Sequence, residues 1–279
     1  MPSIFETLYD SSLEVTLTHS QEYPSDSTQA ANFVLLLAEV RRQLDAYSAT
    51  NFGGYHLLLT IASPAGPTNY NILQLKAMDA YLDAWHLMAY DFAGSWDANS
   101  GHQANLSPNP SNPLSTPFSA NKAVTDYIAA GVTASKIVLG MPLYGRAFQN
   151  TAGIGKPYTV VGTPDNVGSF EAGIWNFAVL PRAGATEVYD SVSGATYSYD
   201  ATTKELISYD TKNQGIRKTT WLKSKGLGGA MFWETSNDKT GAGSLIATVG
   251  GQMTLEGSAN LLRFPTSKYA NLVAGFPNE

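Results

Sequence analysis

The chain has 279 residues, 43% of them hydrophobic and 14% charged, which supports a sizeable core and excludes a globally disordered class. A formal net charge of −6, without any Lys/Arg cluster, argues against a nucleic-acid partner. The absence of cysteine excludes disulfides and Cys-ligated metal sites, and no apolar stretch reaches the ~20 residues needed to cross a membrane.

Four apolar runs predict buried β-strands. The runs are nearly continuous rather than alternating, which is typical of parallel strands covered by helices on both faces. They span residues 55–63 (YHLLLTIAS), 84–92 (AWHLMAYDF), 136–145 (KIVLGMPLYG) and 227–234 (LGGAMFWE).

Helices are predicted between and before these strands. One helical face is formed by residues spaced i, i+3, i+4, i+7 and i+11, namely Phe33, Leu36, Leu37, Val40 and Leu44. A second helix, capped by Ser119 and ended by Gly131, carries Val124, Tyr127 and Ile128. Residues 71–82 and 216–225 complete the alternation. Strands alternating with helices predict an α/β fold with a parallel sheet, and the length suits one barrel of roughly 250 residues.

Two stretches depart from this alternation. Residues 147–217 contain short alternating runs rich in Tyr, Gly, Thr and Asp, which predict a small antiparallel insertion; its DATTKE stretch is a predicted hairpin loop. Residues 100–119 are rich in Pro, Asn and Ser and predict a surface loop. That loop holds the sequon Asn105-Leu106-Ser107, which matters only in a secreted chain.

Three of the four predicted strands end in polar or aromatic residues. The pairs are Tyr90-Asp91, Tyr144 with Arg146, and Trp233-Glu234. Parallel α/β folds keep their chemistry at the carboxyl ends of their strands, so these residues are candidates for a site. A purely structural role is an equally open interpretation from position alone.

These segments carry a resemblance to a known family. From Glu22 onward the chain resembles glycoside hydrolase family 18 chitinases of the fungal secreted type, N-terminally truncated or altered here. The similar segments, which occur in the family's order, are EYPSDSTQAANFVLLL, MAYDFAGSWD, GMPLYGRAF and GGAMFWETSNDK. The resemblance implies a (β/α)8 TIM barrel with a small α+β insertion domain.

The resemblance also implies an activity. It is hydrolysis of β-1,4-linked N-acetylglucosamine polymers with retention of configuration, in which the substrate's acetamido oxygen is the nucleophile and one Glu is the general acid. It implies chitin or chitooligosaccharides as partners, an extracellular location, a monomer, and neither cofactor nor metal. Met1 to Ser20 has neither the basic start nor the apolar run of a signal peptide.

The implied site residues follow position by position. Glu22 matches the proton donor, Tyr90 the residue that orients the acetamido group, and Asp91 a sugar-binding carboxylate. Substrate-binding positions are matched by Trp233 (the aromatic floor under the cleaved sugar), Trp96 (a stacking platform on the leaving-group side), Tyr144, Arg146 and Met88. A core or supporting role is the alternative for each, and Glu234 could line the cleft or pair with Arg146. His86 is predicted to be a core residue, and the four histidines are too scattered to bind a metal.

The chain departs from the family in its N-terminal part. Alignment on Glu22 puts Val15, Thr18 and Ser20 where the family motif Asp-x-x-Asp-x-Asp-x-Glu has aspartates. Ser20 lacks the charge that would stabilise the developing positive charge on the substrate. Impaired hydrolysis, a chitooligosaccharide-binding lectin without turnover, and a non-functional fragment are therefore three open hypotheses.

The resemblance begins at the fourth of eight barrel strands, so we expect an incomplete barrel without its first three βα units. We expect an atypical segment (1–21), a partial barrel (22–146), the insertion domain (147–217), and the last barrel strand with a C-terminal helix (218–279). Leu13, Val15 and Leu17 are spaced two residues apart, so in a strand they would lie on one face. Glu22 would lie on the other face and point toward the barrel axis.

Overall fold

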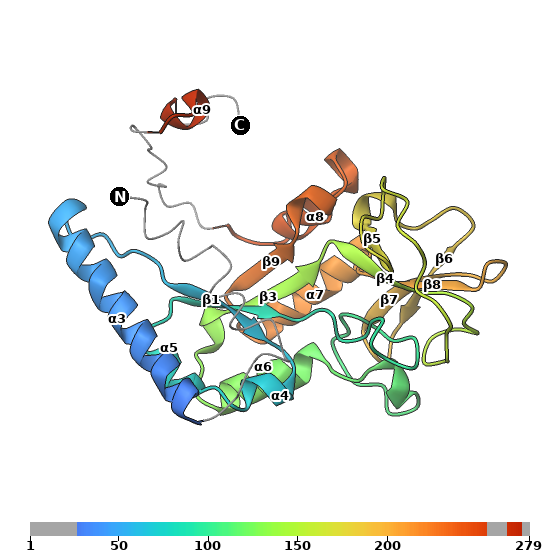
Figure 1. Ribbon diagram of the computed structural model, residues 1–279, viewed down its shortest axis with the longest axis horizontal. Coiled ribbons are helices and arrows are strands. Elements are labelled where there is room, and N and C mark those ends of the chain that lie inside the picture. The colour runs from blue at the N-terminus through green and yellow to red at the C-terminus, as the bar shows by residue number, and fades with distance from the viewer. Residues whose placement is uncertain (1–26, 256–266, 275–279) are drawn as a thin grey trace.

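The computed structural model describes residues 27–255 and 267–274 (Figure 1). The first half consists of α3 (Ser27–Asn51), β1 (Thr60–Pro64), α4 (Pro67–Tyr70), α5 (Leu75–Asp79), β2 (Ala84–Met88), α6 (Ala120–Ala129) and β3 (Ile137–Pro142). The second half consists of β4 (Tyr144–Phe148), β5 (Ile174–Asn176), β6 (Thr186–Asp190), β7 (Ala195–Asp200), β8 (Glu205–Ser208), α7 (Lys212–Ser224), β9 (Gly229–Trp233), α8 (Leu245–Gly250) and α9 (Ala270–Val273). Short 3-10 turns cover Pro113–Ser115, Ala134–Lys136, Phe177–Val179, Thr235–Asn237 and Gly241–Gly243.

A parallel sheet is formed by the four strands that the sequence predicted. Its order is β1-β2-β3-β9 among the described residues, so the prediction of parallel strands with crossover helices is confirmed. The register places Trp85 of β2 beside Ile61 of β1 and Ile137 of β3. These three side chains are buried on the helix-covered face, where they begin the main hydrophobic core.

The opposite face of this sheet is less covered than the sequence indicated. In β2, Trp85 and Leu87 are buried, whereas Ala84, His86 and Met88 are only partly buried. The prediction of two fully covered faces is therefore wrong for this strand within the described part of the chain. An apolar run cannot distinguish the two cases, because Ala and Met are apolar whichever face they occupy.

The predicted helices are confirmed in place but not always in length. Helix α3 contains the predicted apolar face, although Leu36 is exposed and its buried residues are Ala30, Leu37, Leu44 and Ser48. The helix predicted for residues 71–82 is much shorter, since the backbone of Gln74 is not helical and α5 begins only at Leu75. Among the described helices, none is both long and apolar enough to cross a membrane.

Helix α6 begins and ends as its sequence predicts. The Ser119 side chain accepts a hydrogen bond from the Lys122 backbone N–H at 3.4 Å, which caps the first turn. Gly131 follows the helix with φ of +100°, a conformation that glycine adopts without steric cost.

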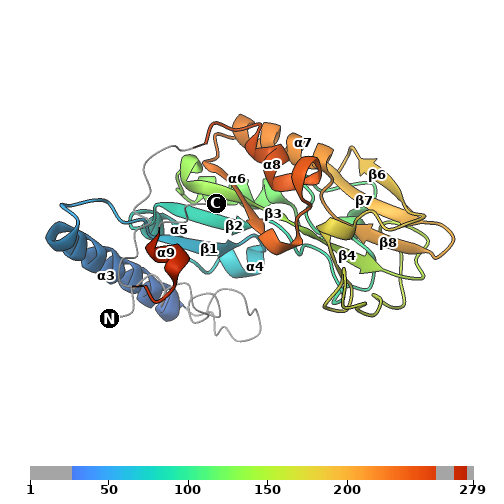
Figure 2. The same cartoon turned by 90° about the horizontal axis from the view of Figure 1, so that it is seen from above.

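The second sheet is antiparallel, with the order β5-β4-β8-β7-β6. It lies beyond one end of the parallel sheet, whereas α3 lies at the other end (Figures 1 and 2). Only Leu143 separates β3 from β4, so the chain passes directly from one sheet into the other. The predicted DATTKE hairpin loop is confirmed: it joins β7 to β8, and Lys204 adopts a φ of 54° there.

The prediction of a surface loop for residues 100–119 is wrong for its first part. Residues 100–106 are all buried, because side-chain amides satisfy backbone carbonyls that would otherwise require water. The Gln103 amide donates to the carbonyls of Tyr144 (2.6 Å) and Ser208 (3.0 Å). The sequon residue Asn105 is itself buried and donates to the carbonyls of Ser107 and Phe118, both at 2.8 Å. Its amide nitrogen is therefore not exposed for glycosylation in the folded protein.

One carboxylate fastens this loop to the antiparallel sheet. Asp190, at the end of β6, accepts hydrogen bonds from the buried His102 side chain (3.2 Å) and from the Asn109 side chain (3.1 Å). The backbone N–H groups of Val192 (2.9 Å) and Ser193 (3.2 Å) donate to its other oxygen. These bonds, led by the one from His102, lower the pKa of Asp190.

We predict that Asp190→Asn lowers the free energy of unfolding by about 1–3 kcal/mol at pH 7, because a charged acceptor with several donors is lost. Because the folded-state pKa of Asp190 is lowered, its contribution to stability is complete above the unfolded-state value of about 3.9 and is lost progressively as pH falls from that value through the folded-state pKa. The difference between wild type and variant should therefore shrink as the pH of urea titrations is lowered from 7 to 3. Asp200→Asn is the matched control, since Asp200 accepts only from its own turn; equal effects of the two substitutions would contradict the prediction.

Candidate active site

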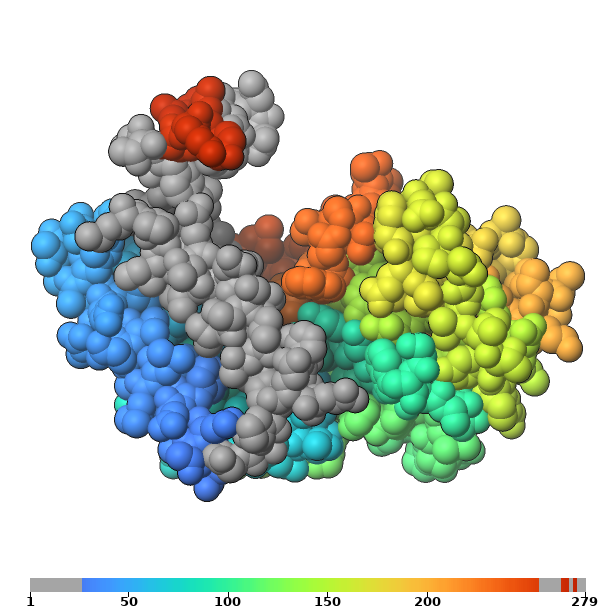
Figure 3. All heavy atoms as spheres, in the orientation of Figure 1, coloured from blue at the N-terminus to red at the C-terminus, as the bar shows by residue number. Residues whose placement is uncertain are grey.

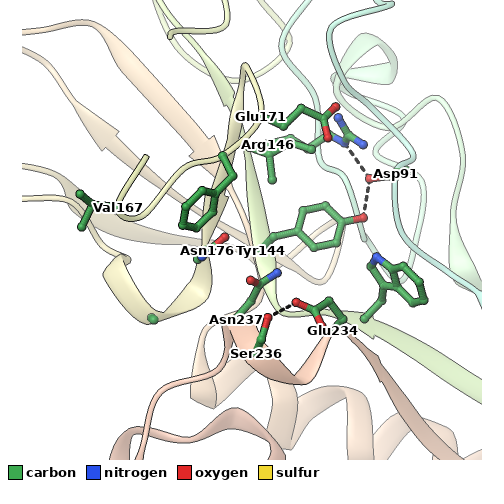
Figure 4. Close-up of a pocket in the computed structure, with 13 residues that line it drawn as sticks. Asp91, Tyr144, Arg146, Val167, Glu171, Asn176, Glu234, Ser236 and Asn237 are labelled. Carbon is green, nitrogen blue, oxygen red and sulfur yellow. Dashed lines mark hydrogen bonds and ion pairs between the residues drawn. The ribbon is translucent and has the colours of Figure 1, made fainter. Parts of the chain in front are cut away.

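A cleft of ≈ 730 Å³ lies where the two sheets meet. Its walls come from Asp91, three residues after the end of β2, from β4, from the segment 167–178, and from the end of β9 with the turn after it. The lining residues include Asp91, Tyr144, Arg146, Glu171, Trp233 and Glu234 (Figure 4). On the face seen in Figure 3, the surface of the segment after β9 (orange) meets the surface of the segment between β4 and β5 (yellow). The cleft therefore occupies the carboxyl end of the parallel strands, the usual place for ligands in this architecture.

Asp91 is the residue that connects the two sheets at this cleft. One of its carboxylate oxygens, Oδ1, accepts hydrogen bonds from the Tyr144 hydroxyl and from Arg146 Nε, both at 2.6 Å (Figure 4). Asp91 has a φ of 58°, a left-handed conformation that Asp tolerates better than most residues. Since Tyr144 and Arg146 both lie on β4, a single carboxylate holds the first strand of the antiparallel sheet against the end of β2.

The titration behaviour of the two donors follows from this arrangement. Burial, followed by the Asp91 charge and hydrogen bond, raises the pKa of Tyr144 well above its usual value, so its hydroxyl stays a donor. Burial alone would lower the pKa of Arg146, but the hydrogen bond and charge of Asp91 outweigh it and the net shift is upward. The cleft therefore keeps one cation and one hydroxyl donor next to the Asp91 carboxylate.

Trp96 contacts the cleft through Arg146. The Arg146 guanidinium carbon lies 4.6 Å from the centroid of the Trp96 ring, although 57% of Trp96 is exposed. Trp96 is not among the described lining residues, so the structure places the predicted platform beside the cleft. Gly94 lies against the same ring: a Cβ there would be 2.5 Å from one ring carbon of Trp96 and 2.7 Å from two others.

Tyr90 and Met88 are not among the described lining residues of the cleft. The Tyr90 ring is 6.3 Å from that of Tyr144 in an edge-on arrangement, so it supports a residue of the cleft wall. A Cβ on Gly140 would be 2.8 Å from the Tyr90 ring, so a side chain on Gly140 would displace that ring. Met88 is the partly buried last residue of β2. The structure thus places Tyr90 against Tyr144, and its predicted role toward a substrate stays a prediction.

Trp233 forms another part of the wall. It is the last residue of β9, it lines the cleft, and it is 50% exposed. Its carbonyl accepts from the Leu143 N–H at 2.8 Å, which fixes the end of β9 beside the start of β4. Glu234 also lines the cleft and accepts from the Ser236 hydroxyl. The open question about Glu234 is thereby decided, since Arg146 pairs with Asp91 and Glu234 faces the cleft.

Glu22 lies outside the described residues, so its position relative to the cleft stays a prediction. Several cleft residues were not predicted, namely Val167, Phe170, Glu171, Ile174, Asn176, Ala178, Ser236 and Asn237. Most of them belong to an irregular stretch without periodicity, which gives no signal in a single sequence. No group of three His, Cys, Asp or Glu that could bind a metal occurs among the residues described. Burial lowers the pKa of His86, but the residue is only partly buried and lies outside the hydrophobic core, so its predicted core role is not borne out.

We predict that Gly94→Ala displaces the Trp96 ring from Arg146 and lowers the free energy of unfolding by about 1 kcal/mol, the scale of an exposed cation–π contact. Gly66→Ala is the control, because a Cβ at Gly66 meets no atom within 4 Å. Urea unfolding of both variants measures the difference. A Gly94→Ala protein as stable as the Gly66→Ala protein would show that the Trp96 contact contributes nothing.

The chain is similar to known proteins over most of its length. The model of the family Glycosyl hydrolases family 18 matches residues 20–238. Endochitinase 1 of Metarhizium robertsii (strain ARSEF 23) is 57% identical over 255 residues, which cover 90% of this chain and 58% of that protein. Chitinase 1 of Aphanocladium album is 52% identical over 255 residues, covering 91% and 59% of the two chains. This chain thus spans less than two thirds of the length of these relatives.

Solved structures agree with the sequence comparisons. The catalytic domain of a psychrophilic chitinase B from Arthrobacter TAD20 has a TM-score of 0.71 and 35% identity, and the match covers 81% of this chain and 52% of that one. A chitinase from Bacillus thuringiensis has a TM-score of 0.68 and 32% identity, covering 81% and 41%. The fold is therefore α/β and TIM-barrel-like, and the chain belongs to the glycosyl hydrolases of family 18.

Proposed function

We propose that this chain acts on chitin, hydrolysing β-1,4 linkages between N-acetylglucosamine units. The names of its relatives support this activity, since those that share most of its sequence are endochitinases and chitinases. The observation that carries the proposal is the cleft, where the exposed Trp233 ring and the Asp91 carboxylate line the same space. An aromatic ring binds the apolar face of a sugar, and a carboxylate accepts from its hydroxyl or amide groups.

Asp91 is the proposed anchor for the substrate. Its Oδ1 is occupied by Tyr144 and Arg146, whereas no described residue donates to Oδ2. The Asp91 side chain is 37% exposed, so Oδ2 can accept a hydrogen bond from a bound sugar. Because Oδ1 is held at two points, the carboxylate is already oriented before the substrate arrives, which lowers the entropy cost of binding.

The proposed chemistry needs a proton donor, and we assign it to Glu22. The acid protonates the glycosidic oxygen while the substrate's own acetamido oxygen attacks the anomeric carbon, so configuration is retained. Glu22 lies outside the described residues, so this assignment rests on the match of its position to the family motif. In the same proposal, the Tyr90 hydroxyl orients the acetamido group.

Hydrolysis should nevertheless be slow. The attacked acetamido group develops a positive charge, and the sequence has Ser20 where the family motif places a carboxylate. Loss of one such electrostatic partner typically costs on the order of 10²–10³ in rate. Binding of chitooligosaccharides without turnover is therefore a second candidate function, favoured by loss of the motif aspartates while Trp233 and Asp91 are retained.

The remaining assignments are part of the same proposal. Residues 147–217 act as an insertion domain that supplies one wall of the cleft, with Arg146 immediately before it. Extracellular localisation, the monomeric state, the incomplete barrel and the domain boundaries at residues 21, 146 and 217 stay predictions.

We predict slow release of the fluorophore from a fluorogenic chitotriose by the purified protein, and none by Glu22→Gln. Ser20→Asp should raise the rate of the wild type by 10-fold or more, since it restores a carboxylate for the developing charge. A fluorescence assay over several hours measures all three proteins, and circular dichroism confirms that they are folded. Equal rates for the wild type and Glu22→Gln would reject Glu22 as the acid, and saccharide binding without any turnover would favour the second candidate.

A further inference from the structure

The antiparallel sheet ends in β6 (Thr186–Asp190), a strand with an open outer edge. It is the last strand in the sheet order and pairs only with β7 among the described residues. Figure 2 shows it at the border of the sheet, beside α7. No described residue forms a backbone hydrogen bond with residues 186–189 from the outer side. An edge of this kind is able to accept a further strand.

The side chains at this edge favour such pairing. Four of the five residues of β6 are exposed, among them Val188 and Tyr189. Val192, which follows the strand, and Ile216 on α7 are also exposed. Residues 186–190 contain neither Lys nor Pro, which often protect an edge strand from pairing. The edge therefore combines unpaired backbone groups with apolar side chains.

Arg217 of α7 adds an oriented positive charge beside this edge. Its guanidinium carbon lies 3.8 Å from the centroid of the Tyr189 ring, so the flat face of the guanidinium contacts the ring. The side chain is exposed, and it forms neither an ion pair nor a hydrogen bond with any described residue. Contact through the flat face leaves the N–H groups of the guanidinium able to bind a carboxylate.

Glu187 supplies a matching carboxylate on the same strand. Alternate residues of a strand share one face, so Glu187 lies on the same face as Tyr189, the face that Arg217 contacts. The Tyr209 hydroxyl donates to Glu187 Oε1 at 2.7 Å, whereas no described residue donates to Oε2. An acid and a base are thus presented near one strand edge without being paired to each other.

We propose that β6 pairs with β6 of a second copy of this chain, antiparallel and with Val188 on the two-fold axis. In this register Glu187 lies opposite the partner subunit's Tyr189, where its Oε2 accepts from the partner subunit's Arg217. The two-fold symmetry forms this ion pair twice and brings the two Val188 side chains together.

The register is self-complementary in its backbone and its charges, which identifies a second copy as the occupant. Odd-numbered residues face odd-numbered ones and even-numbered face even-numbered, so the outward backbone groups of the two strands meet. Thr186 lies opposite Asp190, so no two like charges are directly opposed. The two five-stranded sheets then form one continuous sheet.

This association should be weak. One short strand and two ion pairs bury less surface than the interface of a permanent dimer. The monomer that the family resemblance implies is then the state of a dilute solution, and the dimer forms as the concentration rises.

The test is a light-scattering measurement of molar mass at physiological ionic strength, from about 1 µM to about 1 mM protein. Salt at this concentration screens the repulsion between two chains of net charge −6. The molar mass of the wild type should rise from the monomer value toward the dimer value. Val188→Lys should weaken dimerisation about tenfold or more, because it sets two ammonium groups opposite each other on the axis.

Charge reversal tests the register. Arg217→Glu should also weaken dimerisation about tenfold or more, because repulsion between carboxylates replaces both ion pairs. Lys223→Glu is the matched control: it lies on α7, changes the net charge equally, and its ammonium donates to the Gln252 carbonyl. This control should dimerise like the wild type. Circular dichroism confirms that each variant is folded.

Three results would overturn the proposal. The first is a wild type that keeps the molar mass of the monomer over the whole concentration range. The second is a Val188→Lys protein that dimerises like the wild type, which would place any association elsewhere on the surface. The third is an Arg217→Glu protein that dimerises like Lys223→Glu, which would reject the pairing of Arg217 with Glu187.

Discussion

The cleft of this protein depends on one carboxylate oxygen that accepts two hydrogen bonds. Asp91 Oδ1 receives the Tyr144 hydroxyl and Arg146 Nε at 2.6 Å each, and both donors belong to the strand that begins the antiparallel sheet. The bond from Arg146 joins opposite charges, and such hydrogen bonds are stronger than neutral ones. Because Arg146 is mostly buried, losing its partner would leave a cation in a poorly solvated place, which is far costlier than the contact itself.

The surrounding chain makes this arrangement possible. Leu143 is the single residue between the end of β3 and Tyr144, and both its backbone N–H and its carbonyl form hydrogen bonds. Its N–H donates to the Trp233 carbonyl at 2.8 Å, and its carbonyl accepts from the Phe177 N–H at 2.9 Å. One residue therefore joins β9, the path between the sheets, and the segment after β5. Trp233, Tyr144 and the segment after β5 are therefore held together by backbone hydrogen bonds as well as by side chains.

Much of this could be predicted from the sequence. Long apolar runs locate parallel strands reliably, and polar residues at their ends indicated Asp91, Tyr144 and Arg146 as site residues. Family motifs added roles for Trp233 and Tyr90. What the motifs could not give is the sharing of one oxygen by two donors, since that depends on the left-handed backbone at Asp91 and on how two sheets meet.

Other features were hidden for physical reasons. The loop at residues 100–119 has a surface composition, yet the side-chain amides of Gln103 and Asn105 satisfy backbone carbonyls and allow its first part to be buried. The exposure of Val167 and Phe170 leaves no periodic pattern in the sequence, because the turn that carries them is held by backbone hydrogen bonds that Asp165 accepts. In both cases a polar side chain replaces regular secondary structure as the partner of the backbone, and single-sequence patterns do not record such partners.

The central claim is that Asp91 couples the two sheets through its hydrogen bonds to β4. A double-mutant cycle of Asp91→Ala and Tyr144→Phe, read by the free energy of unfolding in urea, measures this coupling directly. We predict an interaction energy of at least about 1 kcal/mol, in the range for a hydrogen bond to a charged group. Effects that add within about 0.5 kcal/mol would contradict the claim, because independent residues behave in that way.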